Sequence, residues 1–176
     1  MIDRLIDLIV QIWSHIVFFI IVLEYEEGVM LRFGKFNKIL KPGFHWKIPV
    51  IDTAITQHTV WKTINLHPQS LTTEDNKGIV VKGIIKFKIS DIKTFTLDVW
   101  DAPDAISDMT MGIIRDEVME HTWLEIREGK LDKVVSKKAK SEAKRWGLEI
   151  DTVTLIDMAE IVSVRLFGDT KPHYLE

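Results

Sequence analysis

The residues best suited to chemistry are six histidines, and no two of them stand at metal-ligand spacing. They are His15, His45, His58, His67, His121 and His173. The His-Glu-x-x-His string, which places two zinc ligands and a general base on one helix, does not occur. With Cys at 0, thiolate metal sites, disulfides and a cysteine nucleophile are excluded. The sequence therefore predicts no metal site.

Nucleotide-binding and hydrolase motifs are also missing from the sequence. Residues 28–35 contain glycines and a lysine, but in neither the Walker spacing nor the dinucleotide-binding spacing. No serine lies in a Gly-x-Ser-x-Gly elbow. We predict no catalytic residue, no cofactor and no enzymatic activity, because an active site would have to be assembled from residues that share no motif.

Positive charge is concentrated in one short stretch that Glu142 interrupts. The stretch consists of Lys137, Lys138, Lys140, Lys144 and Arg145. On a helix these side chains could bind anionic lipid head groups or an acidic partner, and the alternative is an ordinary solvated surface. The whole chain has a formal net charge of -3, so we expect no nucleic-acid partner.

The most apolar part of the chain is the segment 5–23. As a helix it would be roughly 28 Å long, close to the thickness of the hydrocarbon core of a bilayer. Glu24, Glu26 and Glu27 follow in place of a small-residue cleavage site, which favours a retained anchor over a signal peptide. We expect a membrane anchor helix whose apolar side chains include Leu5, Ile9, Ile12, Trp13, Ile16, Phe18, Phe19, Ile20 and Leu23.

Polar residues four apart interrupt this segment, namely Asp3, Asp7, Gln11 and His15. On a helix they form one slanting stripe, since each step of four residues drifts by only about 40°. The stripe could pack against neighbouring helices in a bundle or ring, and Asp7, Gln11 and His15 are the candidate packing residues. Alternatively, the first half lies at the membrane interface and only the second half is inserted. A third interpretation is an amphipathic helix buried in a soluble domain, which the unbroken apolar run 16–23 disfavours.

Basic residues follow the anchor rather than precede it. Arg4 stands alone before the segment, whereas Arg32, Lys35, Lys38 and Lys41 come after it. The positive-inside rule then favours a cytoplasmic folded part. We expect a single-pass or monotopic protein of a membrane like the bacterial inner membrane.

Strand patterns follow the anchor. Residues 28–36 alternate apolar and charged side chains, residues 41–43 predict a turn, and residues 53–66 predict one long strand. The clearest alternation places apolar side chains and Gly83 at every second position from Ile79 to Ile89, with lysines between them.

Helix patterns begin at Asp101, where an acidic N-cap and a proline in the first turn start a helix. Its apolar positions are Ile106, Met109, Ile113, Ile114 and Val118. A second helix is expected over 127–146, with Gly147 as its stop and with Leu131, Val134, Val135, Ala139 and Ala143 facing inward. A last strand over 148–158 completes an α+β domain, in which helices pack on one face of an antiparallel-rich sheet.

Six tryptophans fall into two predicted groups. Trp13 lies in the anchor, and Trp46 and Trp61 are near it in sequence, which suits an interfacial position. Trp100, Trp123 and Trp146 are expected in the core.

An ordered set of short motifs resembles the SPFH, or band 7, family of stomatins, prohibitins and flotillins. Glu27-Gly28-Val29, Arg32-Phe33-Gly34-Lys35, Lys41-Pro42-Gly43-Phe44-His45 and Ile48-Pro49-Val50-Ile51-Asp52 look like the start of that domain after its membrane segment. Further matches are Thr73-Glu74-Asp75-Asn76, Ile89-Ser90-Asp91, Arg115 and Trp146-Gly147-Leu148-Glu149-Ile150.

The resemblance implies an anchor over 1–23, an SPFH domain over 24–158 and a short tail over 159–176. It also implies homo- or hetero-oligomeric rings or cages on membrane lipid, which define membrane patches and restrain membrane proteases or channels. It transfers no catalytic residue.

One departure from the family pattern leaves two functions open. Family members usually continue into a long Ala/Glu-rich helix that builds the cage wall, whereas here Gly168-Asp169-Thr170-Lys171-Pro172 ends regular structure. In the scaffold hypothesis, copies assemble through their anchors and folded faces alone. In the adaptor hypothesis, a monomer or small oligomer binds SPFH assemblies of the host or a membrane protease.

Overall fold

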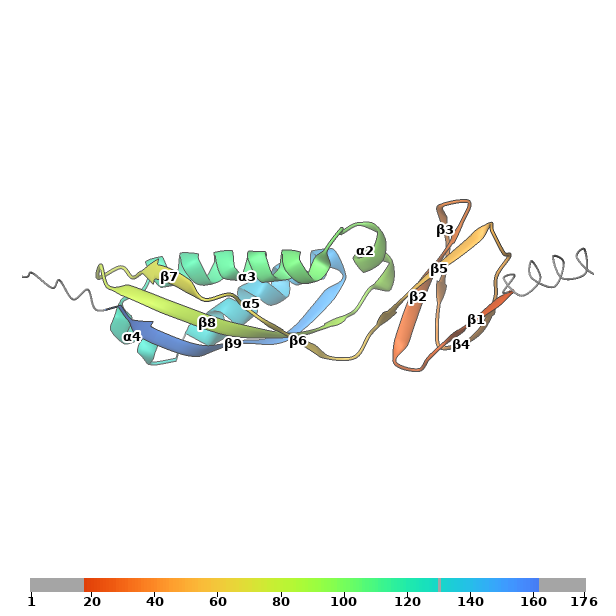
Figure 1. Ribbon diagram of the computed structural model, residues 1–176. Coiled ribbons are helices and arrows are strands. Elements are labelled where there is room, and N and C mark those ends of the chain that lie inside the picture. Colours follow the sequence, from red (N-terminus) through yellow and green to blue (C-terminus); the bar gives the residue numbers. More distant parts are fainter. Residues whose placement is uncertain (1–17, 130, 162–176) are drawn as a thin grey trace, which may run out of the picture.

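The computed structural model describes residues 18–129 and 131–161 of the 176-residue chain. They form an elongated molecule with two parts arranged along its long axis (Figure 1). The N-terminal part contains β1 (Phe19–Val22), β2 (Glu26–Arg32), β3 (Lys35–Leu40), β4 (Gly43–Trp46) and β5 (Asp52–His58). The second part contains the remaining strands and all the helices of the described residues.

The predicted anchor lies mostly outside the described residues, as do Asp7, Gln11, His15 and Trp13. Its C-terminal end was predicted incorrectly. Phe19–Val22 is strand β1, which pairs antiparallel with β4. In the part of the chain that is described, no helix is long and apolar enough to cross a membrane.

Two small antiparallel sheets make up the N-terminal part. One pairs β1 with β4, and the other has the order β3-β2-β5. Val22, Met30 and Leu40 are buried between them, with Ile20 and Ala54 packed against this cluster. The core of this part is therefore small, and most of its apolar side chains lie elsewhere.

Two strand predictions in this region were wrong in extent. Residues 28–36 form two strands, because Phe33 and Gly34 take positive φ angles of 51° and 74° and turn the chain back. Residues 53–66 are also two strands. Strand β5 pairs with β2 in the N-terminal part, whereas β6 (Lys62–Asn65) pairs with β8 in the second part, so the chain between them connects the two parts.

Strand β8 (Gly78–Ile89) is the centre of the second part. Strands β6 and β7 (Gln69–Thr72) pair with it along one side, and β9 (Leu148–Glu160) pairs along the other, all antiparallel. The predicted alternation is confirmed, since every second residue of β8 from Ile79 to Ile89 is buried. The last strand is also confirmed and extends to Glu160.

The helices of the described residues all follow β8 and precede β9. They are α2 (Ile92–Leu97), α3 (Ala102–Met119), α4 (Trp123–Arg127), α5 (Leu131–Ala143) and the short 3₁₀ helix η1 (Lys144–Trp146). The predicted cap of α3 is confirmed, because the Asp101 side chain accepts from the Asp104 N–H. The second predicted helix is split, and Gly129 (φ 74°) lies between α4 and α5. Helix α2 was not predicted from the sequence.

Helices α3 and α5 cover the same face of the sheet (Figure 1). Ile106, Ile114 and Val118 of α3 are buried in this core, where Met109 and Ile113 also pack. Four of the five inward predictions for α5 are confirmed: Leu131, Val135, Ala139 and Ala143. Val134 was predicted incorrectly and is 36% exposed, because it lies on the flank of the helix.

Gly147 stops η1 in the left-handed conformation, with φ 71°, as predicted. A Cβ atom there would lie 2.5 Å from the carbonyl oxygen of Asp91. The N–H groups of Ser90 and Asp91 both donate to the Gly147 carbonyl oxygen, at 2.9 and 3.0 Å. This glycine therefore lets the end of α5 pack against the start of α2.

We expect Gly147→Ala to lower the free energy of unfolding by more than about 2 kcal/mol, since it adds a backbone clash to left-handed strain. Gly34→Ala is the matched control, with φ 74° and open space around the added Cβ. It should cost about 1 kcal/mol, the strain alone. Urea denaturation of both variants measures the difference, and equal losses would show that the close approach at Gly147 has no energetic effect.

Candidate functional site

The outer face of the β1–β4 ribbon is apolar and has no cover in the described residues. Phe19 lies opposite Trp46, and Ile21 lies opposite Phe44, so the four side chains share one face. The Phe19 and Phe44 rings stack with centroids 5.3 Å apart, and Trp46 meets Phe44 edge-on at 5.2 Å. All four are exposed, and Trp46 reaches 69%. We call Phe19, Ile21, Phe44 and Trp46 the aromatic face.

Further exposed apolar side chains surround the aromatic face in sequence. Phe18 precedes β1, and Ile48 and Val50 follow β4. Val50 is 102% exposed and has a φ of 69°, which is strained for a β-branched residue. An exposed cluster of apolar side chains such as the aromatic face marks an interaction site for a protein or a membrane.

An ion pair holds the Val50 loop against the sheet. The guanidinium of Arg32 donates to both carboxylate oxygens of Asp52, at 2.8 and 3.0 Å, and the Ile48 N–H donates to Oδ2 at 2.8 Å. The Asp52 side chain is fully buried, whereas that of Arg32 is 44% exposed. The Arg32 hydrogen bond, followed by the Ile48 N–H, lowers the pKa of Asp52 to about 2. The carboxylate thus fixes both ends of the loop.

The predicted basic stretch is divided by its partners in the fold. Lys138 contacts the buried carboxylate of Glu117 on α3, and this partner raises the pKa of Lys138. Arg145 pairs with Glu142 at 3.4 Å. Lys137, Lys140 and Lys144 are exposed, and none of them forms an ion pair with another described residue. Their predicted contact with lipid or a partner stays a prediction.

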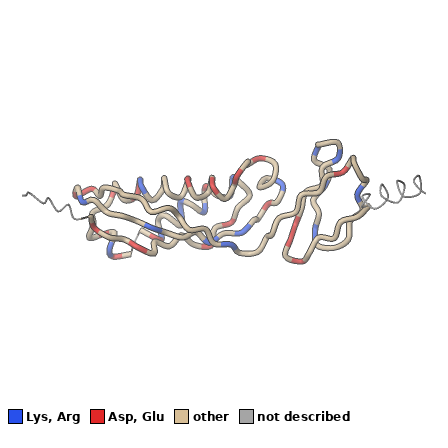
Figure 2. Tube along the Cα trace, viewed as in Figure 1, with Lys and Arg blue, Asp and Glu red and all other residues tan. Residues whose placement is uncertain are grey.

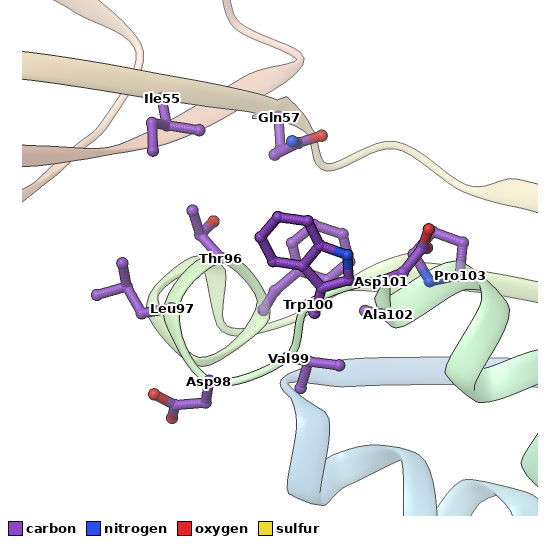
Figure 3. Close-up of a pocket in the computed structure, with 11 residues that line it drawn as sticks. Ile55, Gln57, Thr96, Leu97, Asp98, Val99, Trp100, Asp101, Ala102 and Pro103 are labelled. Atoms are coloured by element: carbon purple, nitrogen blue, oxygen red, sulfur yellow. The ribbon is translucent and has the colours of Figure 1, made fainter.

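The tryptophans are distributed differently from the prediction. Trp123 and Trp146 pack against the core as expected, and Trp61 lies beside the ammonium groups of Lys86 and Lys88. The core prediction for Trp100 was wrong, because it lies in the tight connection between α2 and α3 and is 102% exposed. Figure 3 shows its ring in the cavity between this connection and β5, with a volume of about 640 Å³.

No reactive constellation emerges from the described residues. Among them, no group of three or more His, Asp or Glu side chains could hold a metal ion. The cavity beside Trp100 has Asp98 and Asp101 as its titratable lining groups, with no nucleophile and base in contact.

Sequence reasoning missed the aromatic face, although the signal was present. Phe19 and Ile21 alternate along β1, and Phe44 and Trp46 alternate along β4, which is the strand period. The apolar run 16–23 concealed this, because a continuous apolar segment fits a helix or a strand equally well.

We expect Asp52→Asn to destabilise the protein at neutral pH. The contribution of a carboxylate with a lowered pKa is complete above its unfolded-state value and disappears as the pH falls through the folded-state value, here about 2. The difference in unfolding free energy between wild type and variant should therefore be constant above about pH 5 and shrink from pH 4 toward 2. Urea denaturation at several pH values tests this. Arg32→Gln should reproduce the neutral-pH loss, and a loss independent of pH for Asp52→Asn would contradict the account.

Comparison of the sequence with those of known proteins finds several relatives. The chain is 27% identical over 142 residues to an uncharacterized protein of Methanocaldococcus jannaschii, covering 76% of this chain and 68% of that protein. It is 28% identical over 143 residues to Stomatin-1 of Caenorhabditis elegans, covering 78% and 43%. It is 34% identical over 84 residues to the modulator of FtsH protease HflC of Escherichia coli, covering 44% and 25%.

The chain thus spans less than half the length of the last two relatives. A family model described as SPFH domain / Band 7 family matches residues 20–160, which include every described strand from β2 to β9 and all the described helices. This match covers both parts of the fold, three of the four residues of the aromatic face (Ile21, Phe44 and Trp46) and the Arg32–Asp52 ion pair. The chain belongs to the SPFH domain / Band 7 family.

Proposed function

We propose that this protein is a membrane-bound scaffold whose copies assemble side by side, organising a patch of membrane or limiting access to a membrane protease or channel. The aromatic face is the observation that carries this proposal. It lies in the N-terminal part, directly after the apolar sequence segment 5–17. A membrane surface would cover it without any further protein.

The free energy of burying apolar side chains favours contact between the aromatic face and a membrane. Burial of one large apolar side chain is worth about 1.5–3 kcal/mol, so partial burial of two phenylalanines, a tryptophan and an isoleucine adds several kcal/mol. Tryptophan prefers the interface between lipid and water, where its ring is in an apolar environment and its N–H remains wet. Trp46, the most exposed member of the face, fits that position.

The apolar segment before β1 is proposed as the anchor. Since Phe19–Val22 is strand β1, the proposed anchor would end before Phe19. Asp7, Gln11 and His15 would then face neighbouring anchors rather than lipid. The SPFH domain would extend to about residue 158, and residues 159–176 would form a tail.

The relatives support the choice of client. The name of HflC in Escherichia coli describes it as a modulator of the FtsH protease. By analogy, the scaffold would act on a membrane protease through access rather than through chemistry, and the protein would not be an enzyme. The alternative is an adaptor that binds SPFH assemblies of the host, or the protease itself, as a monomer or small oligomer.

Single-cysteine labelling tests the membrane seat, because the natural chain has no cysteine to compete for the dye. An environment-sensitive dye on Phe44→Cys should shift to shorter wavelength on lipid vesicles and be quenched by a lipid-phase quencher. The matched control is Ile156→Cys, which is 49% exposed on β9 in the second part. Its dye should remain in water. Equal quenching at both positions, or none at Phe44→Cys, would contradict the proposed seat.

The mass of the full chain tests the scaffold against the adaptor. We expect a uniform particle of many subunits when the protein is made in cells without related proteins and extracted in mild detergent. Native mass spectrometry gives the copy number. Monomers or dimers in every detergent would instead support the adaptor.

A further inference from the structure

The second part of the molecule has flanks of opposite charge. Helix α3 packs beside β7 on one side of β8, whereas α5 packs on β9 at the other side. The exposed side of α3 is mainly acidic in its first half, and the exposed side of α5 is mainly basic (Figure 2). Opposite charges on opposite edges are the arrangement that lets identical copies pack head to tail.

On the acidic flank, carboxylates surround the exposed apolar side chains of Leu97 and Trp100. Leu97, Asp98, Trp100, Asp101, Asp104 and Asp108, which we call the Trp100 surface, are all exposed. Asp101, Asp104 and Asp108 follow one helix face at spacings of three and four. Asp101 also caps α3, but none of these four aspartates forms an ion pair with any described residue.

Trp100 lacks the cation that Trp61 has. In the same chain, the Lys86 and Lys88 ammonium groups lie 5.4 and 4.7 Å from the Trp61 ring centroid. Such contacts are attractive, because the ring face is electron rich. Trp100 is fully exposed, and within the described ranges no cation lies over its ring. Its surroundings, apolar with a rim of carboxylates, match a surface of lysines.

The basic flank provides that surface. Lys133, Lys137, Lys140 and Lys144, the α5 lysine face, are exposed along one side of the helix, and none of them has an ion-pair partner among the described residues. An apolar groove of about 490 Å³ lies between lysine stems around Val134. The α5 lysine face is therefore both cationic and partly apolar.

The two surfaces lie at similar positions along the molecule. The Trp100 surface begins where α2 meets α3, and the end of η1, which follows α5 directly, contacts the start of α2 through Gly147 and Asp91. A neighbour displaced sideways, without sliding along the long axis, would bring one surface against the other. Electrostatic complementarity of this kind selects a partner and fixes the alignment.

We propose that the Trp100 surface of one copy binds the α5 lysine face of the next. This inference rests on the proposed scaffold function and assigns its contact. A second copy suits the α5 lysine face better than lipid does, because the aromatic face occupies the other part of the molecule. A lipid contact at α5 is an outcome of the test.

Charge reversal tests the contact in the full-length protein. We expect Asp98→Lys with Asp108→Lys to lower the fraction of high-mass particles at least about tenfold, because two ammonium groups then stand beside the two remaining carboxylates and the Trp100 surface loses its net negative charge. Lys137→Glu with Lys144→Glu should do the same, since the α5 lysine face then loses its net positive charge. An equal mixture of the two double variants should recover large particles, in which the variants alternate. With one variant made isotopically heavy, native mass spectrometry gives the composition of each particle, and alternation predicts equal numbers of the two variants.

Asp157→Lys is the control, an exposed acid on β9 outside both surfaces, and it should assemble normally. Trp100→Ala should reduce assembly without changing the melting temperature, since the side chain is fully exposed. The contact is refuted if either double variant assembles normally, or if the mixture stays small. It is also refuted if Lys137→Glu with Lys144→Glu loses only binding to anionic vesicles. Failure of the wild type to assemble would refute the scaffold itself.

Discussion

Apolar surface that the chain cannot cover by itself governs the N-terminal part of this protein. Two small sheets enclose a core with only Val22, Met30 and Leu40 fully buried, while the aromatic face points outward. Side chains alternate along a strand, so the packing of one side of β1 and β4 into the core leaves their other side exposed. The buried Asp52 carboxylate then holds the Val50 loop beside that surface through Arg32 and the Ile48 N–H. In the proposed function, a bilayer covers this exposed apolar surface.

The second part of the molecule differs from the N-terminal part, because its core is complete. Strand β8 is paired along its whole length with β9 and is covered by α3 and α5 on one face, so its apolar side chains are buried within the chain. The helices are then free to carry unpaired charge outward, acidic on α3 and basic on α5. The separation of charge is not complete, since the buried carboxylate of Glu117 on α3 forms an ion pair with Lys138 of α5. Asp98, Asp104 and Asp108 on one flank and the α5 lysine face on the other form no ion pair with a described residue, and in the proposed assembly a neighbouring copy would neutralise them.

Local signals predicted local structure well. The alternation along β8, the Asp101 cap and the Gly147 stop were all recognisable, because each depends on a few adjacent residues. Failures occurred where distant partners decide. Phe19–Val22 is a strand because β4 pairs with it, and Trp100 is exposed because a tight connection leaves it outside the core. The Arg32 and Asp52 motifs were recognised as family features, but their ion pair joins residues of different strands and is not visible from spacing. The lysine stretch was predicted from the sequence. That Lys138 pairs with the buried Glu117, while the other lysines face solvent, depends on the fold and could not be predicted.

Electron cryo-microscopy of lipid vesicles carrying the full chain tests the central claim most directly, because it shows membrane seating and assembly together. The account predicts density for the aromatic face at the lipid surface, with neighbouring copies side by side and the Trp100 surface of each against α5 of the next. Isolated copies, or copies with the β1–β4 ribbon directed away from the bilayer, would contradict it.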